Sequence, residues 1–429
     1  MSILSPALDR RRALGLLAAG GALSLARPSF GQEAAGRVVV VGGGFGGATA
    51  ARYIRRLAPA VEVTLIEPAA RFYTCPFSNL YLGGLRDFDS LGHGFDDLKR
   101  AGVTVIHALA EDVDTAGRAV RLSTGDRVPY DRLVLSPGID IRWGALEGYD
   151  EAAADKAPHA WKAGPQTRLL RAQLEAMEDG GLFVLVAPAN PFRCPPGPYE
   201  RVSMVAHYLK TTKPRSKVLV LDAKDQFSKQ GLFTDAWAAV YGDLIEWVGL
   251  SQDGKVVRVD ADALEVETEF GQKHKAAVLN VVPPQTAGFI AERAGVTDES
   301  GWVPVMPATF ASPRVEHVYV VGDATIAAPM PKSGFCANTQ AKVVAAAVVA
   351  DLAGREPPPP VWVNTCYSLI APDYGISVAG VYRVIDGKIG EVEGSGGVSP
   401  READAAFRKR EADYGAGWYA AISADIWGV

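Results

Sequence analysis

Residues 37–47 read RVVVVGGGFGG, and an alanine-rich stretch, ATAARYIRRL, follows them. The four valines predict a buried strand that runs into a tight turn and then a helix, which is the context of a G-x-G-x-x-G motif. The first glycine of such a motif permits the turn, the second admits a pyrophosphate, and the third lets helix and strand pack closely. Free N–H groups at the helix start favour phosphate. We therefore expect a dinucleotide to bind at Gly42, Gly44, Phe45, Gly46 and Gly47.

The next expected strand, residues 61–66, ends at Glu67. An acid at the end of the second strand of such a unit can accept a hydrogen bond from a ribose hydroxyl. A glycine turn without a ligand is the plainer interpretation, but the strand, helix and acid in register disfavour it. The alternation of strands and helices indicates an α/β fold.

Composition narrows the class of protein. The chain has 429 residues, of which 48% are hydrophobic and 22% are charged, and this suits a globular protein of two or three domains. The formal net charge is −5. Because there is no excess of basic residues, nucleic acid is not an expected partner.

The first residues differ from the rest of the chain. Residues 9–12 read DRRR and precede an apolar run over residues 13–26, after which small residues follow. The run is shorter than the roughly 20 residues that span a bilayer, so it predicts a signal peptide of the twin-arginine type over residues 1–31. The alternative is a disordered basic tail, which this order of features disfavours. We expect a mature protein in a bacterial periplasm, without a transmembrane segment.

Four cysteines are present, namely Cys75, Cys194, Cys336 and Cys366. In an oxidising compartment, two structural disulfides with three possible pairings are the plainest interpretation. The chain has no C-x-x-C spacing, and its six histidines are not clustered. We therefore expect no metal site.

A second dinucleotide domain would show a second glycine motif after the apolar strand at residues 181–186, but the chain continues APANPFRCPPGPYE. The five prolines of that segment stiffen the chain and lack N–H donors, so they cannot cradle a pyrophosphate. A rigid loop that carries Cys194 and Glu200 thus replaces the expected NAD(P)H site. Residues 218–223 continue this domain, residues 237–248 resemble a helix, and residues 277–282 are expected to return to the first domain.

Residues 315–325, VEHVYVVGDAT, form a second strong motif. A buried strand ends at Gly322 and Asp323, where the glycine allows close approach and the aspartate can bond the ribityl chain of FAD. Cys336 opens a long apolar helix, and a helix N-terminus stabilises a thiolate. A buried, inert cysteine is the alternative at that position.

The remaining chain, residues 356–429, resembles a small α+β cap or interface domain with a hairpin at 376–385 and 388–392. The expected organisation is a signal peptide (1–31), a discontinuous FAD-binding domain (32–150 and 277–355), a second Rossmann-like domain without a glycine motif (151–276), and this C-terminal domain (356–429).

Five segments carry a resemblance to a known family: RFYTCPFSN, PFRCPPGPYER, DAKDQFSKQGLF, VYVVGDAT and PKSGFCANTQA. The chain resembles the two-dinucleotide-fold flavoproteins of the disulfide reductase class. More narrowly, it is similar to the flavoprotein subunit of flavocytochrome c sulfide dehydrogenase, a periplasmic relative of sulfide:quinone reductase. The resemblance covers nearly all of the mature chain. It implies two Rossmann-like domains and a C-terminal domain.

The resemblance also implies roles for single residues. Cys75 matches the cysteine that anchors FAD through a thioether, Cys194 and Cys336 match the redox-active pair, and Glu200 matches the active-site carboxylate. Cys366 receives no chemical role. A c-type cytochrome subunit is the implied electron acceptor, and the haem must come from that partner because this chain has no C-x-x-C-H.

In the implied reaction, HS⁻ attacks the disulfide and leaves a persulfide on one cysteine and a thiolate on the other, and two electrons pass into FAD. Glu200 shuttles the proton. Two alternatives stay open: a quinone-reducing relative, and a flavoprotein that activates sulfur carriers by thiol exchange. An NADH-dependent reductase is disfavoured by the proline-rich loop.

Overall fold

The computed structural model describes residues 35–428. The expected signal peptide, residues 1–31, lies outside the described residues, and its expectation stays a prediction.

The first sheet is built around the glycine-rich turn. Its five strands are all parallel and have the order β20-β9-β1-β2-β5. Helices α2 and α10 pack against each other beside it, and β1 and α2 supply much of a continuous apolar core. The bounds are β1 Gly36–Val41, α2 Phe45–Leu57, β2 Val61–Ile66, β5 Thr104–Ile106, β9 Arg132–Leu135, β20 Val318–Val320 and α10 Gly334–Leu352.

The second sheet is also parallel, with the order β13-β12-β11-β17. Its strands are β11 Leu182–Ala187, β12 Lys217–Asp222, β13 Ile245–Val248 and β17 Val278–Val281. The expectation that residues 277–282 return to the first domain is wrong, because β17 pairs with β11. The helix expected over residues 237–248 is also wrong in extent. Helix α8, Gln230–Tyr241, ends at Gly242, and β13 follows.

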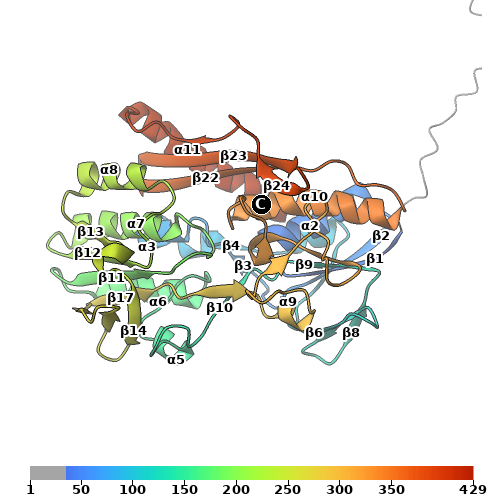
Figure 1. Cartoon of the computed structure of the whole chain (residues 1–429), viewed down its shortest axis with the longest axis horizontal. Coiled ribbons are helices and arrows are strands. Elements are labelled where there is room, and N and C mark those ends of the chain that lie inside the picture. Colours follow the sequence, from blue (N-terminus) through green and yellow to red (C-terminus); the bar gives the residue numbers. More distant parts are fainter. Residues whose placement is uncertain (1–34, 429) are drawn as a thin grey trace, which may run out of the picture. The chain divides into compact units, whose positions relative to one another are not determined.

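The C-terminal segment contains β22 Val361–Ala371, β23 Tyr374–Ile385, β24 Lys388–Glu391, β25 Gly397–Val398 and the long helix α11 Ala405–Trp427. The predicted hairpin is present as β23 and β24, whereas β22 and α11 were not predicted. Strand β22 contacts α7 (Gly197–Thr212) and α8 beside the second sheet and α10 beside the first. In Figure 1, β22 is red, α7 and α8 are green, and α10 is orange. This segment therefore bridges the two sheets.

Shorter elements connect these parts. Antiparallel pairs and small sheets are formed by β3 Phe72–Tyr73 with β4 Gly92–His93, by β6 Ala110–Asp114, β7 Ala119–Leu122 and β8 Arg127–Pro129, by β10 Ile139–Ile141 with β18 Gln285–Ala287, and by β14 Val256–Asp260, β15 Glu265–Thr268 and β16 Lys273–Lys275. Strands β19 Val303–Pro304 and β21 Thr325–Ile326 pair in parallel. The remaining helices are α3 Ser78–Leu82, α4 Asp96–Arg100, α5 Glu151–Ala154, α6 Pro165–Ala176, α9 Ile290–Arg293 and the 3-10 turns Phe88–Leu91, Leu250–Gln252 and Gly322–Ala324.

Helix α10 is the one helix in the described part of the chain that is long and apolar enough to cross a membrane, with 61% of its apolar window buried inside the protein. Its buried residues belong to the core shared with α2 and β1. By burial it is a core helix of the first sheet.

Candidate active site

The glycine-rich turn has no space for side chains. A Cβ on Gly42 would lie 2.3 Å from the carbonyl oxygen of Ser136, and Gly42 has a φ of +101°. A Cβ on Gly47 would lie 1.8 Å from the carbonyl oxygen of Gly42. Helix α2 begins at Phe45, and no side chain caps its N-terminus. The backbone N–H groups of the first turn are therefore free of a capping side chain, as an anion site requires.

Glu67 closes the turn from the end of β2. It is 9% exposed; its Oε2 accepts from the backbone N–H of Gly43 at 2.7 Å, and its Oε1 accepts from that of Ala69 at 2.9 Å. Each carboxylate oxygen can accept a further bond. The structure thus places the acid against the turn, where a ribose hydroxyl can reach it.

Asp323 follows Gly322 directly after β20. The Oδ1 atom of Asp323 is buried and has no hydrogen-bond partner within the described residues, and burial raises the pKa of this carboxyl. Arg193 and Lys332 act in the opposite direction and favour the ionised form. Because a buried carboxylate oxygen without a donor is costly, this atom fits a ligand hydroxyl such as that of a ribityl chain. The residues at the turn and at Asp323 therefore fit FAD.

Cys75 lies in the loop after β3, and its Sγ is 3.2 Å from both the Nη2 of Arg193 and the carbonyl oxygen of Trp161. The C-terminal helix holds this loop. The hydroxyl of Tyr419 lies 2.7 Å from the Oγ1 of Thr74, and the ring of Tyr419 stacks on Phe77 with centroids 4.4 Å apart.

Trp427, near the end of α11, reaches the glycine-rich turn itself. Its Nε1 donates to the carbonyl oxygen of Gly43 at 3.3 Å. Its ring stacks between His93, at 4.6 Å, and Phe72, at 5.6 Å. No local sequence signal points to this hydrogen bond, because its partners are 384 positions apart in the chain.

Cys194 has a φ of +58°, which is uncommon for a residue other than glycine and is often found at functional sites. Its N–H donates to the carbonyl oxygen of Lys332 at 2.8 Å. Burial raises the pKa of its thiol, and the charges of Cys366 and Glu200 raise it further, whereas Arg193 lowers it.

Glu200 lies in the first turn of α7. Its Oε2 accepts from the Nδ2 of Asn79 at 2.8 Å, and its Oε1 accepts from the N–H of Leu369 at 3.0 Å. Burial raises the pKa of the Glu200 carboxyl, while these bonds and the charges of Lys229 and Arg201 lower it. A buried carboxyl with a raised pKa is suited to proton transfer near neutral pH.

Cys336 is 1% exposed in the first turn of α10, where its N–H donates to the Oγ of Ser333 at 3.0 Å. Burial raises the pKa of its thiol to about 12. The thiolate stabilisation expected from the helix start does not hold, because burial outweighs it. The charges that act on Cys336 are those of Asp323 and Cys366.

Cys366 lies on β22, and sequence reasoning gave it no role. Its charge raises the pKa of both Cys194 and Cys336. The charge of Glu200 acts on both Cys194 and Cys366, and these two cysteines are half-buried, whereas Cys336 is buried in the apolar core. All four cysteines are free thiols. Recognition of the alternating strand VWVNTCYSLIA would have drawn attention to Cys366.

The ends of β11 and β12, where a second dinucleotide would bind, are filled by the chain itself. Asp222 is fully buried and accepts from the hydroxyl of Tyr199 at 2.6 Å and from the Nζ of Lys224 at 2.5 Å. The ring of Tyr199 stacks on Phe227 with centroids 3.5 Å apart. Within residues 35–428, no group of three His, Cys, Asp or Glu side chains could hold a metal ion.

Three protein-family models match the chain. Residues 36–171 match pyridine nucleotide-disulphide oxidoreductase, residues 167–283 match the central part of the sulfide dehydrogenase [flavocytochrome c] flavoprotein chain, and residues 358–427 match the flavin-binding part of flavocytochrome c sulphide dehydrogenase. A sulfide dehydrogenase flavoprotein chain from Chlorobaculum thiosulfatiphilum is 67% identical over 43 residues, which are 10% of this chain and 90% of that one. The chain belongs to the flavoprotein family of sulfide dehydrogenases and sulfide:quinone oxidoreductases.

Other members of this sulfide dehydrogenase and sulfide:quinone oxidoreductase family are more distant. The mitochondrial sulfide:quinone oxidoreductase of Mus musculus is 23% identical over 67% of this chain, and the match spans only 65% of its own length. The solved sulfide:quinone oxidoreductase from Aquifex aeolicus has a TM-score of 0.70 and 20% identity, with 91% of this chain and 92% of that chain covered. These matches confirm the predicted fold class, two Rossmann-like domains with a C-terminal domain.

Proposed function

We propose that this chain oxidises sulfide through a redox-active cysteine pair and FAD, and that it passes the electrons to a c-type cytochrome subunit. One side chain carries the proposal. Arg193 bonds the thiol of Cys75, and its charge acts on both the Cys194 thiol and the Asp323 carboxyl. One guanidinium thus contacts the expected flavin anchor and acts through its charge on the expected redox cysteine and the expected ribityl ligand.

We propose Cys366 as the partner of Cys194 in the pair, in place of Cys336, which the sequence favoured. Cys366 shares the surroundings of Glu200 and Cys194, whereas Cys336 is enclosed in the core. A closed Cys194–Cys366 disulfide is the oxidised form of this proposal, and the free thiols are its reduced form.

The reaction begins when HS⁻ attacks one sulfur of the disulfide. The S–S bond breaks, a new S–S bond forms to the incoming sulfur, and the second cysteine leaves as a thiolate that keeps the electron pair. The attacked cysteine then carries a persulfide, whose proton passes to Glu200. The buried position of Glu200, held by Asn79 and Leu369, orients the carboxylate for this transfer.

The residues that would hold FAD are those already predicted: Gly42, Gly44, Phe45, Gly46, Gly47, Glu67, Gly322 and Asp323, with Cys75 as the proposed covalent anchor. When bound, FAD supplies a two-electron acceptor that can release electrons one at a time. Covalent attachment through Cys75 is supported by the position of its thiol beside Arg193.

The cytochrome partner and the periplasmic location are also proposals. The names of the two flavocytochrome c family models and the expected twin-arginine signal support them. The competing function is that of a sulfide:quinone oxidoreductase, which the relatives from Mus musculus and Aquifex aeolicus favour by name.

An anaerobic stopped-flow experiment tests the proposal. Sulfide is mixed with the purified, oxidised holoprotein, and either cytochrome c or a soluble quinone is then offered. We expect sulfide to bleach the flavin absorbance and cytochrome c to restore it. A flavin that stays oxidised contradicts sulfide oxidation, and restoration by the quinone alone supports the competing function.

A further inference from the structure

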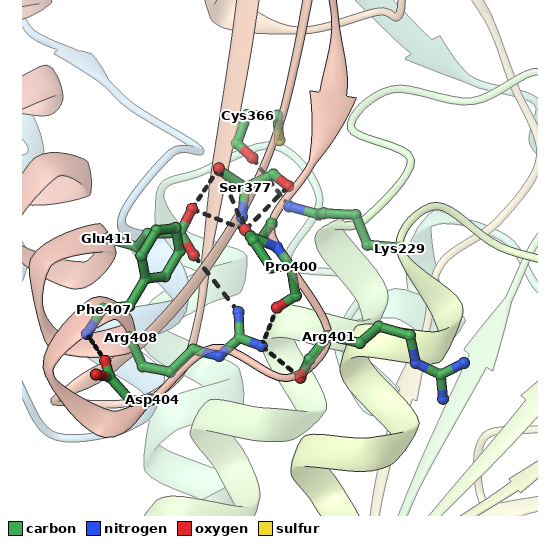
Figure 2. Close-up of polar contacts among 10 residues, drawn as sticks. Lys229, Cys366, Ser377, Pro400, Arg401, Asp404, Phe407, Arg408 and Glu411 are labelled. Atoms are coloured by element: carbon green, nitrogen blue, oxygen red, sulfur yellow. Dashed lines mark hydrogen bonds and ion pairs between the residues drawn. The ribbon is translucent and has the colours of Figure 1, made fainter.

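Lys229 is a buried cation beside the cysteine that we place in the redox pair. It precedes α8 with a φ of +62° and is 8% exposed. Its Nζ donates to the carbonyl oxygen of Cys366 at 2.9 Å and to the Oγ of Ser368 at 2.8 Å. Figure 2 shows its side chain extended towards Cys366. A residue other than glycine in this backbone conformation is uncommon, as at Cys194.

The ammonium group of Lys229 bonds a side chain on the face of β22 that carries the Cys366 thiol. Cys366 and Ser368 are two residues apart in this strand, so their side chains point to the same face. The Ser368 hydroxyl that accepts from Lys229 also lowers the pKa of Cys366. Lys229 therefore contacts both the carbonyl group of Cys366 and the side chain that lies two residues further on the same face.

The charge of Lys229 is not neutralised by a nearby carboxylate. Buried Lys224 pairs with Asp222 at 2.5 Å, whereas no carboxylate of residues 35–428 lies within 4.0 Å of the Nζ of Lys229. A buried ammonium without a counter-ion is costly, and an anion that forms beside it offsets that cost. The anions within its reach are those of Cys366 and Glu200, since its charge lowers the pKa of both groups.

We propose that Lys229 is a positioning residue that holds an anionic sulfur on Cys366 after the disulfide opens. An anion arises there in both directions of attack. If HS⁻ attacks Cys194, Cys366 leaves as the thiolate; if HS⁻ attacks Cys366, it carries the persulfide, which becomes anionic once Glu200 takes the proton. The use of this anion in turnover rests on the function proposed above, but its stabilisation by Lys229 does not.

Other groups also face Cys366 and set the background for a pH experiment. Burial and then the charge of Glu200 on α7 raise the pKa of Cys366. Cys366 in turn raises the pKa of Cys194, in the loop before α7, and of Cys336 on α10. Lys229 and Ser368 are the groups that lower the pKa of Cys366. A substitution of Lys229 should therefore move the Cys366 pKa upward.

The test compares Lys229→Met with Lys229→Arg in the full-length holoprotein. The reduced protein is treated with iodoacetamide over a range of pH, and peptide mass spectrometry measures the modified fraction of Cys366. Lys229→Met should raise the midpoint of the pH profile by about one unit, which is an approximately tenfold slower modification below the midpoint. Lys229→Arg keeps the charge and should retain the wild-type midpoint. Lys99→Met, an exposed lysine on α4, is the matched control.

An unchanged midpoint in Lys229→Met overturns the inference. If that variant does not fold, Lys229→Gln, which keeps a hydrogen-bond donor without the charge, replaces it; a raised midpoint supports the inference, and an unchanged one contradicts it. Flavin bleaching by sulfide is measured in parallel on the wild type. A shifted midpoint without bleaching supports the inference and contradicts the proposed function. Bleaching with an unshifted midpoint supports the proposed function and contradicts the inference.

Discussion

Arg193 donates a hydrogen bond from its Nη2 to the Sγ of Cys75 across 3.2 Å. Its neighbour in the chain, Cys194, is the expected redox cysteine. Two consecutive residues of one loop thus contact the proposed flavin anchor and carry the sulfur chemistry. The proline-rich loop that replaces a nicotinamide site therefore joins the two halves of the proposed active site.

Substitution of Cys75 should release the cofactor. If Cys75 holds FAD through a thioether, Cys75→Ala should bind FAD that acid or denaturant removes, whereas the wild type keeps its yellow colour after denaturation. Flavin fluorescence of the denatured polypeptide in a gel measures this. Cys336→Ala is the matched control and should keep the bound flavin. Colour that remains on denatured Cys75→Ala contradicts the assignment.

The two candidate partners of Cys194 can be separated by substitution. Cys194→Ser and Cys366→Ser should abolish bleaching of the flavin by sulfide, because neither variant can form the proposed disulfide. Cys336→Ser should bleach at nearly the wild-type rate, since its thiol lies in the core. Stopped-flow absorbance measures the rates. Loss of bleaching in Cys336→Ser with retention in Cys366→Ser would restore the pair that the sequence favoured.

Glu200 should control the acid limb of the pH profile. Burial raises the pKa of this carboxyl, so its proton is held to a higher pH than that of a free glutamate, and the base form appears only above that pKa. Turnover that needs the base form should therefore fall as the pH drops through the raised pKa. Glu200→Gln should slow turnover by about 10²-fold or more and remove that limb while FAD stays bound. An unchanged limb in the variant counts against the acid–base role.

His93 should make the protein less stable in acid. Burial, and then the charges of Arg71 and Arg86, lower the pKa of His93 from 6.5 to about 4. The unfolded chain binds the proton more readily, so this contribution to stability is complete above pH 6.5 and is lost as the pH falls towards about 4. His93→Phe keeps an aromatic ring beside Trp427 but cannot bind the proton. Between pH 7.5 and pH 5 its free energy of unfolding, measured by chemical denaturation, should fall by about 1 kcal/mol or more less than that of the wild type. An equal fall in both proteins argues against the assignment.

A buried ion pair fastens α11 to the C-terminal hairpin. Glu411 accepts from the hydroxyls of Ser377 and Ser399 at 2.5 and 2.7 Å, and Arg408 lies 3.6 Å from its second oxygen. Figure 2 shows Glu411 between Ser377 and Arg408. Glu411→Ala would leave the charge of Arg408 buried and should reduce the free energy of unfolding by about 3–5 kcal/mol. Asp413→Ala on the exposed face of the same helix should change it by less than about 1 kcal/mol. Chemical denaturation measures both.

Short sequence motifs predicted the parts of the fold that depend on residues close together in the chain. The valine strand and glycines at residues 37–47 are present as β1 and the start of α2, because the turn itself demands glycine. The hairpin around Asp386 and Gly387 was predicted for the same reason. In contrast, residues 278–281 form an apolar strand that could join either sheet, and only its pairing with β11 decides between them.

The site was predicted less completely. Motif positions such as Glu67 and Asp323 follow directly from the ends of strands; Glu67 bonds the turn, Asp323 has a buried oxygen without a partner in the described residues, and their cofactor contacts stay a prediction. The surroundings of Cys194 depend on β22, a strand from far along the chain that carries Cys366. From the sequence, the helix start predicts a stabilised thiolate at Cys336. Burial cancels this effect, and burial depends on how the whole core packs.

The bond from Trp427 to Gly43 has a consequence for biosynthesis. The two residues are separated by 384 positions, so the glycine-rich turn acquires this contact only after residue 427 has left the ribosome. Tyr419 likewise reaches the Cys75 loop only at that stage. Loading of the cofactor should therefore follow the synthesis of residues 419–427, and a polypeptide that is cut before Tyr419 should retain FAD poorly.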